Sequence, residues 1–225
     1  MEKNIPELIV MLTHNDRTVE NAIEVFEAAK DAPAKFWGFK EDGLPEDKMK
    51  VLVEKMKEAG KRAFLEVVAY TEEECLEGAR MGIRCGFDTV MGTMYFDSIK
   101  QACDDAGIAY YPFVGKITGR PSILEGTIEG IVGEAMDLVQ NKGIQGFDLL
   151  GYRFTGDAVK LNAEFVKAVP VPVCLAGSVA SFQRLDEVKA AGAWAFTIGG
   201  AFFEKKFADA SFGEQIKIVV DYMNR

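Results

Sequence analysis

Residues 171–203 read VPVCLAGSVASFQRLDEVKAAGAWAFTIGGAFF, and this stretch contains the unit that recurs along the chain. An apolar run at 171–177 is followed by a segment with helical periodicity, by Gly192, and by a second apolar run at 193–199. This order predicts a strand, a loop, an amphipathic helix that ends at a glycine, and the next strand. Strands that alternate with helices are expected to pair in parallel through right-handed crossovers.

The same unit recurs through all 225 residues. The strands that it predicts are residues 7–13, 35–40, 63–69, 88–92, 109–116, 146–153, 171–177 and 193–199. Eight units, each with its helix, predict one (β/α)8 TIM barrel domain over residues 1–225, an α/β fold that typically takes about 250 residues. The alternative is an open doubly wound sheet. That fold would carry a glycine-rich dinucleotide fingerprint after the first strand, and residues 12–16 (LTHND) contain no glycine.

Composition excludes several classes of protein. The chain is 48% hydrophobic, which rules out disorder, and no apolar run approaches the roughly 18 residues of a membrane span. The N-terminus carries Glu2 and Glu7 and does not resemble a signal peptide, so we expect a cytoplasmic protein. The net charge of −9 argues against nucleic acid as a partner, whereas a small anionic substrate responds to the local field of a cleft. A homo-oligomer stays open.

Cysteine and histidine usage limits the chemistry. The four cysteines show no C-x-x-C spacing and lie in apolar segments, which is typical of reduced core cysteines. His14 is the only histidine, and this excludes a multi-histidine metal site. We therefore predict neither a metal nor an organic cofactor.

In a TIM barrel the active site is built from the carboxyl ends of the strands and the loops that follow them. The polar and small residues expected there are Thr13, His14, Asp16, Lys40, Tyr70, Gly92, Thr93, Lys116, Tyr152, Arg153, Gly177, Ser178, Gly199 and Gly200. Basic side chains gather at this end of an acidic protein, and this favours an anionic ligand. Thr93, Arg153 and Arg120, which lies in the long loop 117–126, are expected to contact the substrate, and that loop is a candidate lid.

Two segments near the end of the chain carry the sharpest signal. Residues 175–181 (LAGSVAS) and 197–203 (TIGGAFF) each read as a strand that ends in small residues and opens directly into a helix. Backbone N–H groups at such a turn, with the positive end of a helix behind them, can bind a phosphate. Small side chains let the dianion reach the main chain. The alternative interpretation is a pair of ordinary tight turns.

The segments 176–179 (AGSV) and 198–201 (IGGA), with the eight-unit layout, resemble the ribulose-phosphate-binding barrels, a superfamily that acts on small sugar phosphates. The resemblance implies a phosphate bound to the amides of Gly177, Ser178, Gly199 and Gly200. The whole chain is also similar to short bacterial barrels often labelled 4-hydroxythreonine-4-phosphate dehydrogenase. That metal- and NAD-dependent reaction needs several histidine ligands and a dinucleotide site, and this sequence offers neither.

Better-known members of the superfamily differ at their reactive residues. Pentose-phosphate epimerases hold a metal with two histidines, and this chain has one histidine. The decarboxylase pattern D-x-K-x-x-D is absent, and residues 147–153 lack the sixth-strand lysine of many class I aldolases. Prenyltransferase barrels place an acid just after the first strand, where Asp16 stands, but the rest of that match is weak.

Glu66 lies within the apolar strand 64–68 (FLEVV), where a charge is costly unless it is paired or used. If Glu66 points into the barrel, Lys40 and Lys116 are its expected partners. A pair at about 4 Å gains roughly 4 kcal/mol before desolvation at an effective dielectric constant near 20. Glu66 would then abstract a proton next to a phosphosugar carbonyl while a lysine stabilises the enediolate, as in an isomerase or epimerase. The alternative is a purely structural ion pair.

Two other functions stay open beside the isomerase or epimerase that we expect. Lys116 or Lys40, with a pKa lowered by the other cation and by burial, would form a Schiff base, as in a class I aldolase or lyase. The third hypothesis is a barrel that senses a phosphosugar without turning it over. His14 is placed for acid–base chemistry or for contact with a substrate hydroxyl. In each case the expected partner is a small phosphorylated metabolite.

Overall fold

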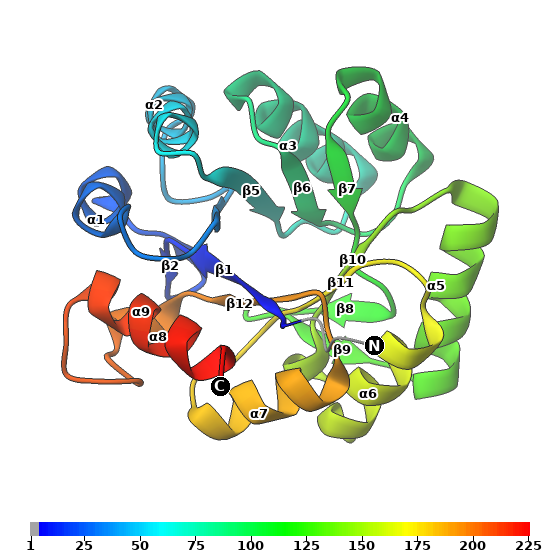
Figure 1. Cartoon of the computed structure of the whole chain (residues 1–225). Helices are drawn as coiled ribbons and strands as arrows, with labels where there is room; N and C mark the ends of the chain where they lie inside the picture. The colour runs from blue at the N-terminus through cyan, green and yellow to red at the C-terminus, as the bar shows by residue number, and fades with distance from the viewer. Residues whose placement is uncertain (1–4) are drawn as a thin grey trace.

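The computed structural model describes residues 5–225 and shows eight parallel strands that close almost completely into a barrel (Figure 1). The strands are β1 (Glu7–Met11), β4 (Phe36–Lys40), β5 (Arg62–Val67), β6 (Thr89–Gly92), β7 (Ala109–Tyr111), β10 (Phe147–Leu149), β11 (Val173–Leu175) and β12 (Ala195–Ile198). They pair in the order β10-β11-β12-β1-β4-β5-β6-β7. The TIM barrel predicted from the sequence is confirmed.

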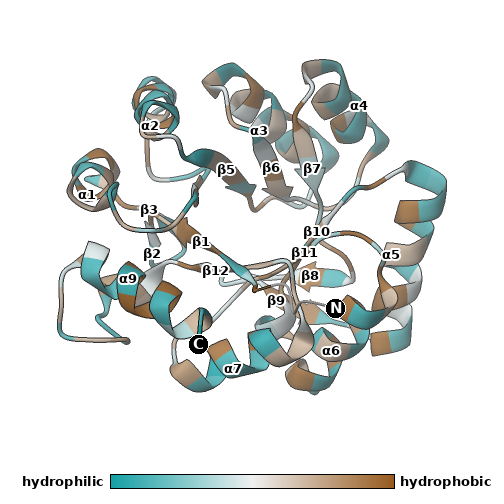
Figure 2. Ribbon diagram, viewed as in Figure 1, coloured by the Kyte–Doolittle hydropathy of each residue, from teal (hydrophilic) through white to brown (hydrophobic). Residues whose placement is uncertain are grey.

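Helices surround the strands. They are α1 (Ala22–Ala29), α2 (Glu46–Glu58), α3 (Glu72–Cys85), α4 (Asp97–Ala106), α5 (Ile128–Lys142), α6 (Ala158–Ala168), α7 (Phe182–Ala191), the short α8 (Gly200–Phe203) and α9 (Phe212–Met223). Figure 2 shows hydrophilic and hydrophobic residues side by side on these helices, as expected when one face packs on the sheet. Among residues 5–225, no helix has the length and apolar character needed to cross a membrane.

Four helices end at a glycine, as the recurring strand–helix unit predicted. A glycine with a left-handed backbone caps α3, α4, α5 and α7, and these residues are Gly86, Gly107, Gly143 and Gly192. A residue without a Cβ adopts this conformation at little cost, and the turn satisfies the last carbonyl groups of the helix. The local sequence therefore determines where these four helices end.

The gap in the barrel lies between β7 and β10. There the Asp148 N–H donates a hydrogen bond to the Pro112 carbonyl oxygen, at 3.1 Å. Strand β7 itself ends at Tyr111, although the Phe113 N–H still donates to the Thr93 carbonyl oxygen, at 2.9 Å. The predicted strand 109–116 is too long, because Lys116 already belongs to another strand, β8 (Lys116–Thr118).

Two β-hairpins stand at the carboxyl ends of the strands. The chain beyond β7 forms β8 (Lys116–Thr118) and β9 (Ile123–Glu125), where the sequence predicted a loop. A second hairpin, β2 (Thr13–His14) and β3 (Arg17–Thr18), follows β1. Its turn residues Asn15 and Asp16 have φ angles of 52° and 64°, as a two-residue hairpin turn with both central φ angles positive requires. Asn and Asp tolerate this conformation better than other residues with side chains.

The inside of the barrel is apolar lower down and polar near the carboxyl ends of the strands. The apolar cluster consists of Ile9, Met11, Phe64, Met91, Cys174 and Ala195. Glu66 lies two residues beyond Phe64 in β5 and therefore points to the same face. Lys40 and Asp148 are buried with it. The fold thus gathers charged side chains at the end of the barrel where the sequence predicted the site.

Candidate active site

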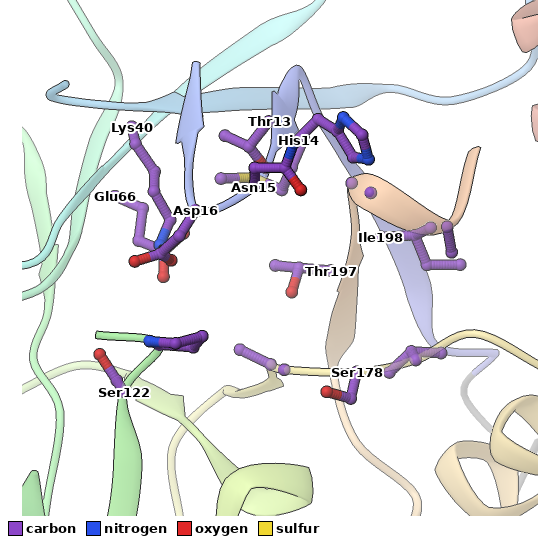
Figure 3. Close-up of a pocket in the computed structure, with 18 of the residues that line it drawn as sticks. Thr13, His14, Asn15, Asp16, Lys40, Glu66, Ser122, Ser178, Thr197 and Ile198 are labelled. Atoms are coloured by element: carbon purple, nitrogen blue, oxygen red, sulfur yellow. The ribbon is translucent and has the colours of Figure 1, made fainter. Parts of the chain in front are cut away.

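A cavity of about 760 Å³ opens at the carboxyl ends of the strands (Figure 3). Its walls come from the β2–β3 hairpin, from the tip of the β8–β9 hairpin, and from the segments that follow β10, β11 and β12. Lys40 and Glu66 line it from neighbouring strands. Most of the residues singled out in the sequence line this cavity, and five do not: Tyr70, Gly92, Thr93, Lys116 and Tyr152.

Lys40 and Glu66 are the predicted pair, and they stand opposite each other in register on β4 and β5. Lys40 Nζ lies 3.9 Å from Glu66 Oε2 and also forms an ion pair with the Asp16 carboxylate. The residues are 8% and 9% exposed. Burial acts to lower the pKa of Lys40, but Glu66 and Asp16 outweigh it and raise that pKa above its ordinary value. The ammonium group is therefore charged at neutral pH.

Asp16 reaches Lys40 because it lies at the turn of the β2–β3 hairpin, which forms part of the cavity wall. Figure 3 shows the side chains of Asp16, Lys40 and Glu66 converging. The sequence identified an acid after the first strand but did not pair it with Lys40. The signal for the hairpin was the Asn15–Asp16 dipeptide, which is a favourable two-residue turn.

Two of the residues that lie outside the cavity had been predicted to act in catalysis or to contact the substrate. Lys116 stands on the β8–β9 hairpin, its side chain is 70% exposed, and its Nζ pairs with Glu125 Oε2 at 3.1 Å. The prediction that Lys116 lies beside Glu66 is wrong because β7 ends at Tyr111 and Lys116 belongs to the β8–β9 hairpin. Thr93 is fully buried, and its hydroxyl is hydrogen-bonded to the Tyr110 hydroxyl at 2.7 Å. Its predicted place against the substrate is also wrong, since the side chain points into the protein.

The two small-residue turns both line the cavity. Gly177 and Ser178 have left-handed backbones, with φ angles of 83° and 56°. Gly199 packs so tightly that a Cβ there would lie 2.5 Å from Thr13 Oγ1. Within the part of the chain that the structure describes, the N–H groups of Gly177, Ser178, Gly199 and Gly200 have no protein acceptor. These four amides are available to an anion.

The two turns lead into different structures. The second opens directly into α8 at Gly200, as predicted. After the first, β11 ends at Leu175 and α7 begins only at Phe182, so a loop separates the strand from the helix. The prediction of a directly following helix is wrong there, and the amides of the loop are the available donors at that turn.

Arg153 and His14 flank the two turns. A Cβ at Gly177 would come within 2.6 Å of Arg153 Cγ, so the arginine lies against the first turn at the end of the short 3-10 segment η1 (Gly151–Arg153). His14 Nε2 lies 3.4 Å from Glu204 Oε1, and its Cδ2 would be 3.5 Å from a Cβ at Gly200. Figure 3 shows His14 well away from Glu66. His14 therefore lies beside the second turn, next to the Glu204 carboxylate.

Arg120 lines the cavity from the tip of the β8–β9 hairpin. Its guanidinium group is hydrogen-bonded to residues that follow β4 and β5. Its Nη2 donates to Glu41 Oε1 at 3.3 Å and to the Val68 carbonyl oxygen. Nearby, the Tyr70 hydroxyl donates to the Gly119 carbonyl oxygen at 2.7 Å. These contacts fasten the predicted lid to the end of β5, so that it covers one side of the cavity.

Asp148 is a buried acid that the sequence prediction omitted. It is 0% exposed, and within the described chain neither of its carboxylate oxygens has a hydrogen-bond partner. Burial first, and then the Glu66 carboxylate, raise the pKa of Asp148 well above its ordinary value against the opposing effect of Lys40. A signal was present, because Asp148, like Glu66, interrupts an apolar strand, here residues 147–150 (FDLL).

Replacing Asp148 by Asn is expected to flatten the pH dependence of stability. The folded protein keeps the Asp148 proton above pH 3.8, where the unfolded chain loses it, so stability falls as pH rises from there toward the raised folded pKa. The slope for one proton is about 1.4 kcal/mol per pH unit. Urea unfolding of wild type and Asp148→Asn between pH 4.5 and 8 measures it. Asp137→Asn, an exposed control, should keep the wild-type slope. Equal slopes in wild type and Asp148→Asn would mean that Asp148 is ionised in the folded protein.

Comparisons with known proteins inform the fold. No family model matches the sequence, and no curated protein matches it. Solved structures match nearly the whole chain. Orotidine 5'-phosphate decarboxylase from Pyrococcus horikoshii OT3 has a TM-score of 0.68 at 15% identity, and the match covers 97% of this chain and 99% of that one.

Two further solved structures are similar. A 4-hydroxy-2-oxoglutarate aldolase/2-deydro-3-deoxyphosphogluconate aldolase from TTHB1 has a TM-score of 0.65 at 12% identity, covering 96% of this chain and 94% of that one. The N-acetylmannosamine-6-phosphate 2-epimerase from Clostridium perfringens has a TM-score of 0.63 at 14% identity, covering 88% of each chain. These likenesses confirm the predicted TIM-barrel fold. Since one fold carries many reactions, the site must assign the chemistry.

Proposed function

We propose that this protein is an enzyme that abstracts a proton next to the carbonyl group of a small phosphorylated substrate, as an isomerase or epimerase does. The observation that carries the proposal is the buried group of Lys40, Glu66 and Asp16 in a cavity that also exposes the main-chain amides of two small-residue turns. The cation and its carboxylates suit the carbonyl end of a phosphosugar. The amides of the two turns suit its phosphate end.

Each member of the buried group has a chemical task. Lys40 places its positive charge where the carbonyl oxygen gains negative charge as the enediolate forms. Glu66, whose Oε2 lies 3.9 Å from Lys40 Nζ, is the base that takes the proton from carbon. Asp16 holds Lys40 in position and helps to keep it charged. Because the pKa of Lys40 is raised, Lys40 suits the role of a cation better than that of the free amine of a Schiff base.

The phosphate group is expected to bind the four amides of Gly177, Ser178, Gly199 and Gly200. Arg153 lies against the first turn and adds a guanidinium that suits a phosphate oxygen pair. His14 adds a donor beside the second turn, and Arg120 closes the side of the cavity under the β8–β9 hairpin. The structural neighbours named as a 5'-phosphate decarboxylase and a 6-phosphate epimerase are consistent with a phosphorylated substrate.

The proposal is tested by hydrogen exchange with solvent. The protein is incubated in D2O with a panel of phosphorylated aldoses and ketoses, and deuterium at the carbon next to the carbonyl is measured by NMR and mass spectrometry. Exchange in at least one compound supports the proposal. A compound that raises the melting temperature of the protein without exchanging in any condition would indicate a sensor and overturn it. Borohydride added to the same mixtures separates the aldolase alternative, since a stable adduct on Lys40 would show a Schiff base.

Gly200→Ala is expected to weaken anion binding while leaving the fold intact. Gly200 lines the cavity, its φ angle is not positive, and the nearest atom to an added Cβ is His14 Cδ2 at 3.5 Å, an ordinary contact. The methyl group would stand where the anion approaches the amides. Loss of one hydrogen bond to a charged group costs about 1.5 kcal/mol, or roughly tenfold in Kd.

Calorimetric titration with inorganic phosphate measures this change. Gly133→Ala is the matched control, because Gly133 lies in α5 with nothing within 4 Å of an added Cβ. It should bind phosphate like wild type. Equal phosphate affinity in Gly200→Ala and Gly133→Ala would mean that the Gly200 amide does not bind the anion.

A further inference from the structure

Asp148 lies inside the barrel together with the proposed base. It stands opposite Cys174 of β11, a member of the interior apolar cluster. Glu66 stands opposite Met91 of β6, another member of the same cluster. Residues that are opposite each other in adjacent parallel strands point to the same face of the sheet. The Asp148 and Glu66 carboxyl groups therefore both project into the interior, from strands on different sides of the barrel.

The charges around Asp148 leave no counter-ion for it. The ionisable groups that face it or its neighbours are Glu66 of β5, Lys40 of β4 and Cys174 of β11, with Tyr111 of β7 near Cys174 and Glu41 near Lys40 and Glu66. Lys40 is the positive charge in this group, and it is already paired with Glu66 and Asp16. A further buried carboxylate charge without a donor or a counter-ion is strongly unfavourable.

We propose that Asp148 is a positioning residue that, as a neutral carboxylic acid, holds the one proton of the interior pair and so leaves Glu66 ionised beside Lys40. The inference rests on the proposed function, because it concerns the charge state of the base. The proton resides on Asp148 because Glu66 has a cation at 3.9 Å, whereas the oxygens of Asp148 have no partner in the described chain. The raised pKa of Asp148, caused first by burial, agrees with this assignment.

A neutral Asp148 acts on the reaction through Glu66. An ionised carboxylate at this place would repel the Glu66 charge and raise the proton affinity of Glu66, so that less of the base would be free at neutral pH. In the reaction itself the substrate C–H bond breaks and its proton passes to Glu66. The C–H electron pair forms the C=C bond of the enediolate, and the carbonyl π pair moves to the oxygen beside Lys40. Asp148 keeps its own proton throughout.

Infrared spectroscopy of the substrate-free protein tests the location of the proton. The carbonyl stretch of a protonated carboxylic acid is resolved from carboxylate bands, and we expect the wild type at neutral pH to show a band that comes from Asp148. Asp148→Asn should lose the band, and Glu66→Gln should keep it. The exposed control Asp137→Asn should keep it as well. Loss of the band in Glu66→Gln but not in Asp148→Asn would place the proton on Glu66 and overturn the proposal, as would its absence from the wild type.

A second measurement serves if Asp148→Asn does not fold. Wild-type protein labelled with carbon-13 at the aspartate carboxyl groups is titrated by NMR. One carboxyl carbon that keeps the chemical shift of a protonated acid, after the others have titrated, supports the proposal, and titration of every aspartate at ordinary pH overturns it. Neither measurement needs a substrate, so the result for Asp148 is independent of whether any compound exchanges deuterium.

The pH profile of exchange gives a functional readout once a substrate is found. In the wild type the rate should change where Asp148 ionises beside Glu66, at a pH above the ordinary pKa of a carboxyl group. Asp148→Asn has no proton to lose there, so this change in rate should disappear. A merely structural role would lower the rate by the same factor at every pH, and that result would overturn the proposal.

Discussion

The Glu66→Gln protein is expected to exchange deuterium into a phosphorylated substrate about a thousandfold more slowly than the wild type, because a positioned general base contributes roughly 10²–10⁴ in rate. Glutamine keeps the shape of the side chain but cannot take up the substrate proton. Lys40 stays paired with Asp16, and the two small-residue turns are untouched, so phosphate affinity should be unchanged. Exchange rates by NMR and the Kd of inorganic phosphate are the two measurements.

Glu125→Gln is the matched control for this substitution. Glu125 pairs with Lys116 on the β8–β9 hairpin, and neither residue lines the cavity. This variant should exchange deuterium at the wild-type rate. If Glu66→Gln exchanged as fast as Glu125→Gln, Glu66 would not be the base and the proposed mechanism would fail.

The Lys40→Met protein is expected to be both inactive in exchange and strongly destabilised. Lys40 is 8% exposed, and its removal leaves the Glu66 and Asp16 carboxylates without their counter-ion. Breaking a buried ion pair in this way costs about 3–5 kcal/mol. Methionine fills a similar volume, so the loss reports the charge and not a cavity.

Lys116→Met is the matched control, since it removes the same group from a side chain that is 70% exposed. Exposed ion pairs contribute little to stability, so its unfolding midpoint in urea should stay close to that of the wild type. Its exchange rate should also be that of the wild type. Equal unfolding midpoints for Lys40→Met and Lys116→Met would contradict a stabilising buried ion pair at Lys40. Slower deuterium exchange in Lys116→Met would show that Lys116 takes part in the reaction.

The barrel could be predicted from the sequence because its signals are local. Apolar runs, helical periodicity and glycines such as Gly86 and Gly192 act within one strand–helix unit, and eight repeats leave few ways to arrange the chain. The same local rules located Glu66, since a charge inside an apolar strand requires a partner or a use. They also located the two small-residue turns, because the carboxyl ends of all strands lie on one side of a parallel barrel.

The partners of these residues depend on contacts between distant parts of the chain. Asp16 meets Lys40 only because the β2–β3 hairpin brings them together. Lys116 lies away from Glu66 because β7 ends at Tyr111 and the chain then forms the β8–β9 hairpin. Asp148 shows the limit most clearly. Its position in an apolar strand could be read from the sequence, but its charge state depends on how many carboxylates share one ammonium, and only the closed barrel brings those groups together.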